Sequence, residues 1–131
     1  MNRYAGVAHA LLRIVAGLLL FQPGTMKMFG WYGGMPPGVA LSGLVLAAGL
    51  LEIVLGPLLI LGLWTRPVAF LASGEMAVAY FYGHFPRGFW PIQNHGESAV
   101  LLCFIFLYLS AVGAGPFSLD GLIARRRVGR G

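Results

Sequence analysis

The sequence predicts an all-α integral membrane protein, a bundle of four transmembrane helices with both termini in the cytoplasm. Three observations predict it: a composition poor in charge, four apolar segments, and basic residues gathered on one side of those segments. Hydrophobic residues make up 58% of the 131 residues and charged residues only 10%, whereas a soluble domain carries roughly 25% charged residues. Because so few charges cannot cover a water-exposed surface, lipid is the expected solvent.

The four apolar segments form a single transmembrane domain that occupies residues 1–131. The predicted spans are 4–21, 39–63, 67–82 and 98–112. Each can cross roughly 30 Å of hydrocarbon at about 1.5 Å per residue, provided that the shorter ones extend into their flanks. The tight turn at 64–67 places a proline at a helix start. Aromatic residues near the ends of the spans are expected at the membrane interface: Trp31, Tyr32, Trp64 and Trp90.

Basic residues set the expected orientation of the spans. With four crossings, six basic residues fall on the side of the termini and two, Lys27 and Arg87, fall on the other, with Arg13 counted as intramembrane. The more basic side is expected to be cytoplasmic. Residues 121–131 then form a basic cytoplasmic tail. No nucleic acid is expected as a partner, because the chain offers no soluble basic face.

Small residues inside the spans are interpreted as packing positions. They recur every four positions on the second and third spans: Gly43, Ala47, Ala69, Ser73 and Ala77. Such tracks let helices approach closely in lipid. Cys103 is the single cysteine, so the chain forms no internal disulfide and offers no paired-thiol chemistry.

Three ionisable residues lie inside the predicted spans, where each needs a physical reason because charge in lipid is costly. Counted from the cytoplasmic helix ends, Arg13 lies roughly 13 Å deep, Glu52 roughly 16 Å and Glu75 roughly 12 Å. The three are therefore expected to form one buried polar network, in which the arginine fork binds both carboxylates. A proton on one glutamate, or a further donor such as His9 or Tyr80, would balance the charge. Two interpretations stay open: a clamp that fixes helix register, or a proton or quinol site.

A second polar layer is expected near the outer surface. Its candidate ligand-pocket residues follow the first span or flank the loop before the fourth: Gln22, Lys27, His84, Asn94 and Glu97. Hydrogen-bond donors and a carboxyl at this level suit a polar headgroup such as a quinone ring. Contact with interfacial water is the other interpretation. No metal is predicted, because the spacing of His84, His95 and Glu97 matches no metal-binding motif.

These residues also carry a resemblance to a known family. The runs that carry it are Leu12-Arg13-Ile14, Lys27-Met28-Phe29-Gly30-Trp31, Leu51-Glu52-Ile53, Gly62-Leu63-Trp64-Thr65-Arg66, Glu75-Met76-Ala77-Val78-Ala79-Tyr80-Phe81, Asn94-His95-Gly96-Glu97 and Gly115-Pro116-Phe117-Ser118-Leu119-Asp120. In this order they resemble the DoxX family over almost the whole chain. The family often has Asn-Gly-Gly where this chain has Asn94-His95-Gly96, so His95 departs from its pattern.

The resemblance implies a four-helix, multi-pass protein of the bacterial inner membrane. Members of the family are linked to quinone-coupled oxidation of thiosulfate and to membrane oxidoreductase complexes in oxidative-stress defence. The chain is therefore interpreted as a small subunit of a quinone-linked membrane oxidoreductase system, with a redox partner protein in the lipid bilayer; self-association stays open. No cofactor is encoded, and a quinone is the candidate ligand. The alternative is a non-enzymatic membrane adaptor or a small-molecule permeation protein.

Overall fold

The computed structural model describes residues 2–34 and 43–130, which are helical with no β-strand among them. They confirm the all-α class. The long helices are α1 (Arg3–Phe29), α2 (Gly43–Leu61), α3 (Thr65–Ala79) and α5 (Glu97–Val112). The shorter elements are η1 (Trp31–Gly33), the π-helical η2 (Tyr80–His84), η3 (Phe85–Arg87), α4 (Pro91–Asn94) and α6 (Leu119–Arg130). Residues 39–42, the predicted start of the second span, lie outside the described residues.

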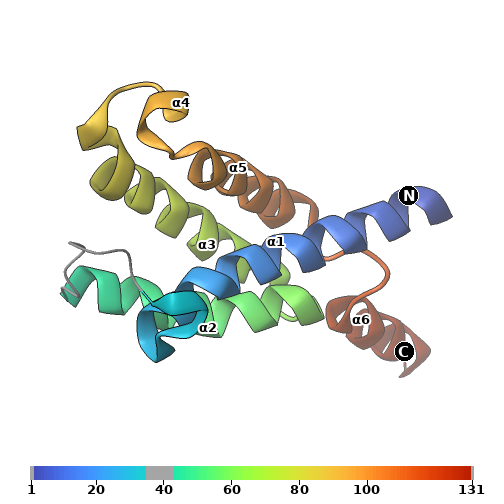
Figure 1. Ribbon diagram of the computed structural model, residues 1–131. Coiled ribbons are helices and arrows are strands. Elements are labelled where there is room, and N and C mark those ends of the chain that lie inside the picture. The colour runs from blue at the N-terminus through green and yellow to red at the C-terminus, as the bar shows by residue number, and fades with distance from the viewer. Residues whose placement is uncertain (1, 35–42, 131) are drawn as a thin grey trace.

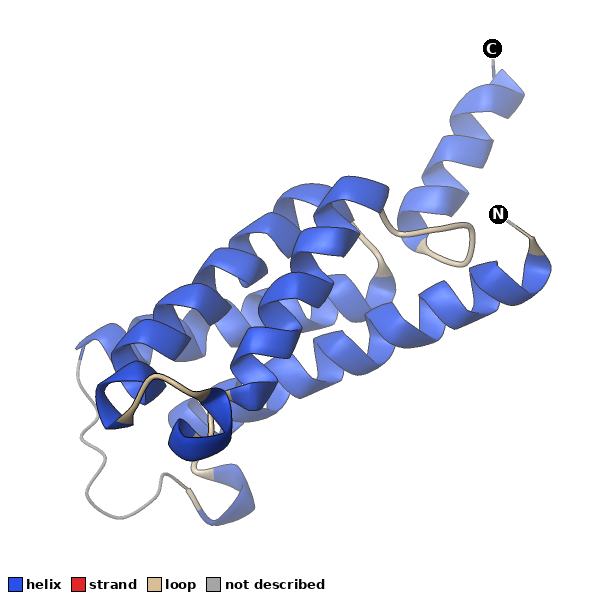
Figure 2. Cartoon of the chain, turned by 90° about the horizontal axis from the view of Figure 1, so that it is seen from above, coloured by secondary structure: helices blue, strands red, loops and turns tan. Residues whose placement is uncertain are grey.

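The long helices are arranged as two antiparallel pairs, α1 with α2 and α3 with α5 (Figure 1). Both chain termini lie at one end of these pairs, together with the α2–α3 turn and the end of α5 (Figures 1 and 2). We call this the terminal end, and the opposite end, with η2 and α4, the loop end. Each long helix contributes to one hydrophobic core, with Leu20, Leu59, Phe106 and Leu109 among its most buried residues.

Helix α1 is longer than the sequence predicted. It continues from the expected end at residue 21 to Phe29, and Pro23 lies inside it. A proline removes one backbone donor but is tolerated in apolar helices that pack against neighbours. The helix begins with Asn2, whose side chain accepts from the Ala5 N–H at 2.8 Å, and ends at Gly30 in the left-handed region, φ 68°. Lys27, expected after the first span, is therefore part of α1.

Glycines hold the α1–α2 pair close together. A Cβ built on Gly24 lies 2.8 Å from the Glu52 Cβ, and one on Gly56 lies 2.8 Å from the Phe21 Cβ. Real Cβ atoms do not approach so closely, so only glycine fits at these positions. Gly24 and Gly56 therefore let the α1 and α2 backbones come together near Glu52.

The α3–α5 pair uses the small residues that the sequence indicated on the third span. Ala69 and Ser73 are buried, and the Ser73 hydroxyl donates to the Cys103 carbonyl at 2.8 Å. Gly43 and Ala47 were also expected to be packing positions, but they do not pack against another helix in the described part of the chain. A Cβ on Gly43 meets no atom within 4 Å of the described structure, and Ala47 is exposed.

Two helices in the described part of the chain are long and apolar enough to cross a membrane, α1 and α2. Helix α5 is apolar but shorter, at 16 residues. Helix α3 has 15 residues and continues without a break into η2. Large apolar side chains on these helices, such as Leu11, Val15, Leu50 and Leu101, are 50–63% exposed. Such a surface matches lipid rather than water.

Candidate functional site

Arg13 lies at the terminal end and binds backbone carbonyls. Its side chain is 2% exposed. The Nε donates to the Leu59 carbonyl at 2.9 Å, while Nη1 donates to Ala114 at 2.5 Å and Nη2 to Phe117 at 2.9 Å. The guanidinium therefore joins the last turn of α2 to the connection between α5 and α6.

The expected pairing of Arg13 with Glu52 and Glu75 was wrong. Arg13 lies level with Leu59, in the last turn of α2, because α1 projects beyond the end of that helix. The prediction had placed the ends of all helices in one plane. At its actual level the arginine meets unpaired C-terminal carbonyls and the negative end of the helix dipole, and both favour a cation.

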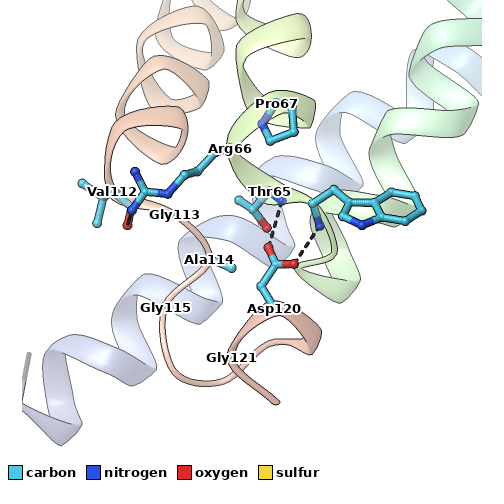
Figure 3. Close-up of a pocket in the computed structure, with 10 residues that line it drawn as sticks. Thr65, Arg66, Pro67, Val112, Gly113, Ala114, Gly115, Asp120 and Gly121 are labelled. Atoms are coloured by element: carbon cyan, nitrogen blue, oxygen red, sulfur yellow. Dashed lines mark hydrogen bonds between the residues drawn. The ribbon is translucent and has the colours of Figure 1, made fainter. Parts of the chain in front are cut away.

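Asp120 organises the same end of the molecule. Its carboxylate accepts from the backbone N–H groups of Trp64 at 2.8 Å and Thr65 at 2.9 Å, so the first turn of α3 is capped from α6 (Figure 3). His9 adds a contact across the same connection, since its Nε2 lies 2.8 Å from the Gly113 carbonyl oxygen. Asp120 had no predicted role, although it ends the run Gly115-Pro116-Phe117-Ser118-Leu119-Asp120, which carries part of the family resemblance.

An open pocket of about 360 Å³ lies beside Asp120. Its lining comes from the start of α3, the end of α5 and the start of α6: Trp64, Thr65, Arg66, Pro67, Val112, Gly113, Ala114, Gly115, Asp120 and Gly121. The Arg66 side chain is held by the α5 terminus, because Nη1 donates to the Ala111 carbonyl at 2.9 Å. Figure 3 shows Arg66 reaching toward Val112.

Toward the loop end, Lys27 and Glu52 form an ion pair between α1 and α2. The Lys27 ammonium binds the Glu52 carboxylate, and the two side chains are 17% and 1% exposed. Gly24 lets the α1 backbone approach Glu52 closely, which contributes to the burial of the Glu52 side chain. The two residues were predicted in separate layers, Glu52 in the inner network and Lys27 in the outer pocket.

Glu75 on α3 adds a second carboxyl to this pair. It lies close enough to interact electrostatically with both Glu52 and Lys27. Both of its carboxyl oxygens are buried and no N–H or hydroxyl donor of the described residues binds them, while the Glu52 carboxyl lies within hydrogen-bonding reach. Two carboxyls and one ammonium carry a net charge of −1 when all are ionised, and the cluster is neutral when the carboxyls share one proton. We call Lys27, Glu52 and Glu75 the Lys–Glu–Glu cluster.

Asn94, predicted as a pocket residue, is instead committed to the loop. Its side chain is 0% exposed. The amide donates to the Tyr80 hydroxyl at 3.2 Å and the Gly88 carbonyl at 2.9 Å, and its oxygen accepts from the Gly96 N–H at 2.8 Å. His84 joins through Nδ1, which lies 3.0 Å from the Asn94 carbonyl oxygen. These bonds shape the turn from η2 to α5.

The structure does not bring the five predicted pocket residues together. Lys27 belongs to the Lys–Glu–Glu cluster, while His84 and Asn94 bond to each other. Gln22 is exposed within α1, and Glu97 is exposed at the start of α5. His95 has a left-handed backbone with φ 59°, a conformation that favours glycine. This explains why glycine suits the position where the chain departs from the family pattern.

Sequence comparison with known protein families identifies the family of this chain. The DoxX family model matches residues 8–85. The chain belongs to the DoxX family. A protein of Haemophilus influenzae (strain ATCC 51907 / DSM 11121 / KW20 / Rd), named "Uncharacterized protein", is 42% identical over 125 residues, 92% of this chain and 93% of that protein. No solved structure matches the chain.

The DoxX match includes the residues that build both polar sites within the helices. Arg13, Lys27, Glu52 and Glu75 fall inside residues 8–85, whereas Asn94 and Asp120 fall outside. DoxX proteins are membrane proteins, and this chain is one of them. The exposed apolar side chains of α1 and α2 fit this membership.

Proposed function

We propose that this DoxX protein crosses the bacterial inner membrane four times, with both termini in the cytoplasm. We further propose that it serves as a small subunit of a quinone-linked oxidoreductase system. The common location of both termini supports an even number of crossings. Helix α3 with η2 covers 20 residues, from Thr65 to His84, which is about 30 Å of helix. The excess of basic residues at the terminal end supports its cytoplasmic location.

The Lys–Glu–Glu cluster is the proposed functional site, and one observation carries the proposal. Glu75 buries two carboxyl oxygens that no N–H or hydroxyl donor of the described residues binds, beside the carboxyl of Glu52. Two ionised carboxyls side by side in a buried site are costly, and a proton shared between them relieves that cost. Perturbed carboxyls beside a charge partner are typical of sites that exchange protons.

The chemistry of the cluster fits a quinone. A quinone oxygen accepts a hydrogen bond, which the Lys27 ammonium can donate, and a quinol hydroxyl donates one, which a Glu75 oxygen can accept. When bound, a quinone supplies a carrier for two electrons and two protons. The Glu52 and Glu75 carboxyls share one proton when the cluster is neutral, so this pair is the group that takes up or releases a proton. The electrons come from a partner protein, because the single cysteine, Cys103, offers no thiol pair.

Quinone retention tests the site. The protein is purified from native membranes in mild detergent, and extracted quinone is quantified per chain. We expect enrichment over bulk lipid in the wild type and its loss in Glu75→Gln, which keeps the shape but not the exchangeable proton. Glu97→Gln, at the exposed carboxyl of α5, is the matched control and should retain quinone. A wild-type protein without enrichment would contradict the quinone role and favour an adaptor or permeation protein.

Reporter fusions test the topology separately. An alkaline phosphatase or fluorescent-protein fusion at Gly131 is expected to report cytoplasm, and an insertion between Pro86 and Pro91 is expected to report periplasm. A periplasmic signal at Gly131 would overturn the proposed orientation but leave the Lys–Glu–Glu cluster untouched.

A further inference from the structure

Helix α6 is exposed but has two different sides. From Leu122 to Gly129 every residue is exposed, and in Figures 1 and 2 the helix lies apart from the two packed helix pairs. Leu119, Leu122 and Ile123 follow the spacing i, i+3, i+4, which places them on one side of a helix. Their exposures are 36%, 38% and 40%. The described part of the protein leaves more than a third of each of these side chains exposed.

Two arginines lie next to the apolar stripe of α6, one beyond its end and one at its side. Arg126 follows Leu122 by four residues and extends the apolar side, while Arg127 lies beside it. Arg125 turns back, because its Nη1 donates to the Pro116 carbonyl at 3.1 Å. An apolar stripe bordered by arginines is typical of helices that lie in the plane of a membrane interface.

The start of α6 is fixed at the level expected for lipid headgroups. Ser118 caps the helix by accepting from the Gly121 N–H at 3.0 Å. Asp120 binds the backbone of Trp64 and Thr65, so α6 begins beside the start of α3. Trp64 is 62% exposed, and exposed tryptophans beside arginines mark the membrane–water boundary.

We infer that α6 is an interfacial helix that binds anionic phospholipid headgroups. Leu119, Leu122 and Ile123 enter the boundary of the acyl chains, and Arg126 and Arg127 meet the lipid phosphates. A bilayer covers both the apolar and the basic groups, whereas a nucleic acid would leave the apolar stripe in water. Lipid binding by α6 is independent of quinone binding and rests on the proposed placement of the terminal end at the membrane surface.

The test places a fluorophore on α6 in the full-length protein. In a Cys103→Ser background, Ile123→Cys carries an environment-sensitive dye on the apolar stripe. Val128→Cys carries it on the opposite side, nine residues after Leu119, as the matched label control. The protein is reconstituted in nanodiscs of phosphatidylcholine with or without phosphatidylglycerol, and quenching by lipids brominated near the headgroup is measured. We expect quenching at position 123 that grows with phosphatidylglycerol and falls at high salt, with little at 128.

Arginine variants separate charge from hydrophobic insertion. Each basic residue near an anionic surface contributes about a fivefold preference for the membrane. Arg126→Gln with Arg127→Gln is therefore expected to lower the ratio of membrane-bound to free α6 by about 30-fold. Arg87→Gln, at the loop end, is the control and should match the parent. Equal quenching with and without phosphatidylglycerol, or an unchanged ratio in the double variant, would overturn the inference.

Discussion

Arg13 and Glu75 are both ionisable residues on apolar helices, but their surroundings differ. Arg13 places its charge among the carbonyls of Leu59, Ala114 and Phe117, with three donors engaged at hydrogen-bond distances. Glu75 buries both carboxyl oxygens beside the carboxyl of Glu52, and no N–H or hydroxyl donor of the described structure binds them. The terminal end therefore satisfies its buried charge, and the Lys–Glu–Glu cluster leaves one group unsatisfied.

This difference separates a structural role from a functional one. A buried charge with complete hydrogen bonding holds elements together, and its removal leaves several carbonyls without donors. A buried carboxyl without partners lowers stability, and proteins retain such groups where function requires them. Stability measurements on matched variants test this interpretation.

The largest effect is expected from Arg13→Ala. The substitution leaves the carbonyls of Leu59, Ala114 and Phe117 without their donor at the junction of α1, α2 and the α5–α6 connection. We expect a loss of about 3–5 kcal/mol in the free energy of unfolding, measured by denaturation in detergent. Arg87→Ala, at an exposed arginine of the loop end, should change stability by less than about 0.5 kcal/mol. Similar effects of the two variants would contradict the structural role of Arg13.

The next largest effect is expected from Glu75→Met, with the opposite sign. Methionine fills a similar volume without a buried polar group, so we expect a gain of about 1–3 kcal/mol together with the loss of any quinone enrichment. The melting temperature and the extracted quinone are measured on the same preparations. A clear loss of stability would mean that the Glu75 carboxyl is satisfied in the folded protein, and the comparison with Arg13 would fail.

A pair of double-mutant cycles tests which cation belongs to Glu52. Lys27→Met and Glu52→Gln are expected to show a coupling of about 1–2 kcal/mol, because each single change leaves one member of an ion pair buried alone. Arg13→Ala and Glu52→Gln should be additive within about 0.5 kcal/mol. Additivity in the first cycle and coupling in the second would restore the pairing that the sequence suggested.

The smallest effect is expected at His95. Its left-handed backbone, φ 59°, disfavours a side chain with a Cβ, so His95→Gly should raise stability by about 0.5–1 kcal/mol. His95→Val should lower it, because a branched Cβ is less compatible with this conformation. The two melting temperatures are compared with the wild type. A destabilised glycine variant would show that the His95 side chain makes contacts that stabilise the loop.

The helical composition of the fold was readable from the sequence, but the helix ends were not. Apolar runs predicted the long helices because lipid-facing segments need long stretches without charge. The prediction ended the first helix at residue 21, before Pro23, whereas α1 continues to Phe29 because packing against α2 compensates for the proline. That extension moved Lys27 from a loop into the helix and beside Glu52.

The candidate site was predictable in its residues but not in its pairings. Charges inside apolar segments correctly drew attention to Arg13, Glu52 and Glu75, since each requires an explanation in lipid. Their partners depend on how far each helix projects beyond its neighbour, which sequence spacing alone does not give. Asn94 resembled a ligand-binding residue because a free amide and an amide bonded within its own loop have the same sequence signature.

The Arg13 contacts also constrain the order of biogenesis. Its partners Ala114 and Phe117 follow it by 101 and 104 residues, which corresponds to about 5–20 s of synthesis at about 5–20 residues per second. During this interval α1 and α2 can already pair, but the guanidinium lacks the α5–α6 connection. The hydrogen bonds from Arg13 to Ala114 and Phe117 therefore form late, after all the long helices have been synthesised.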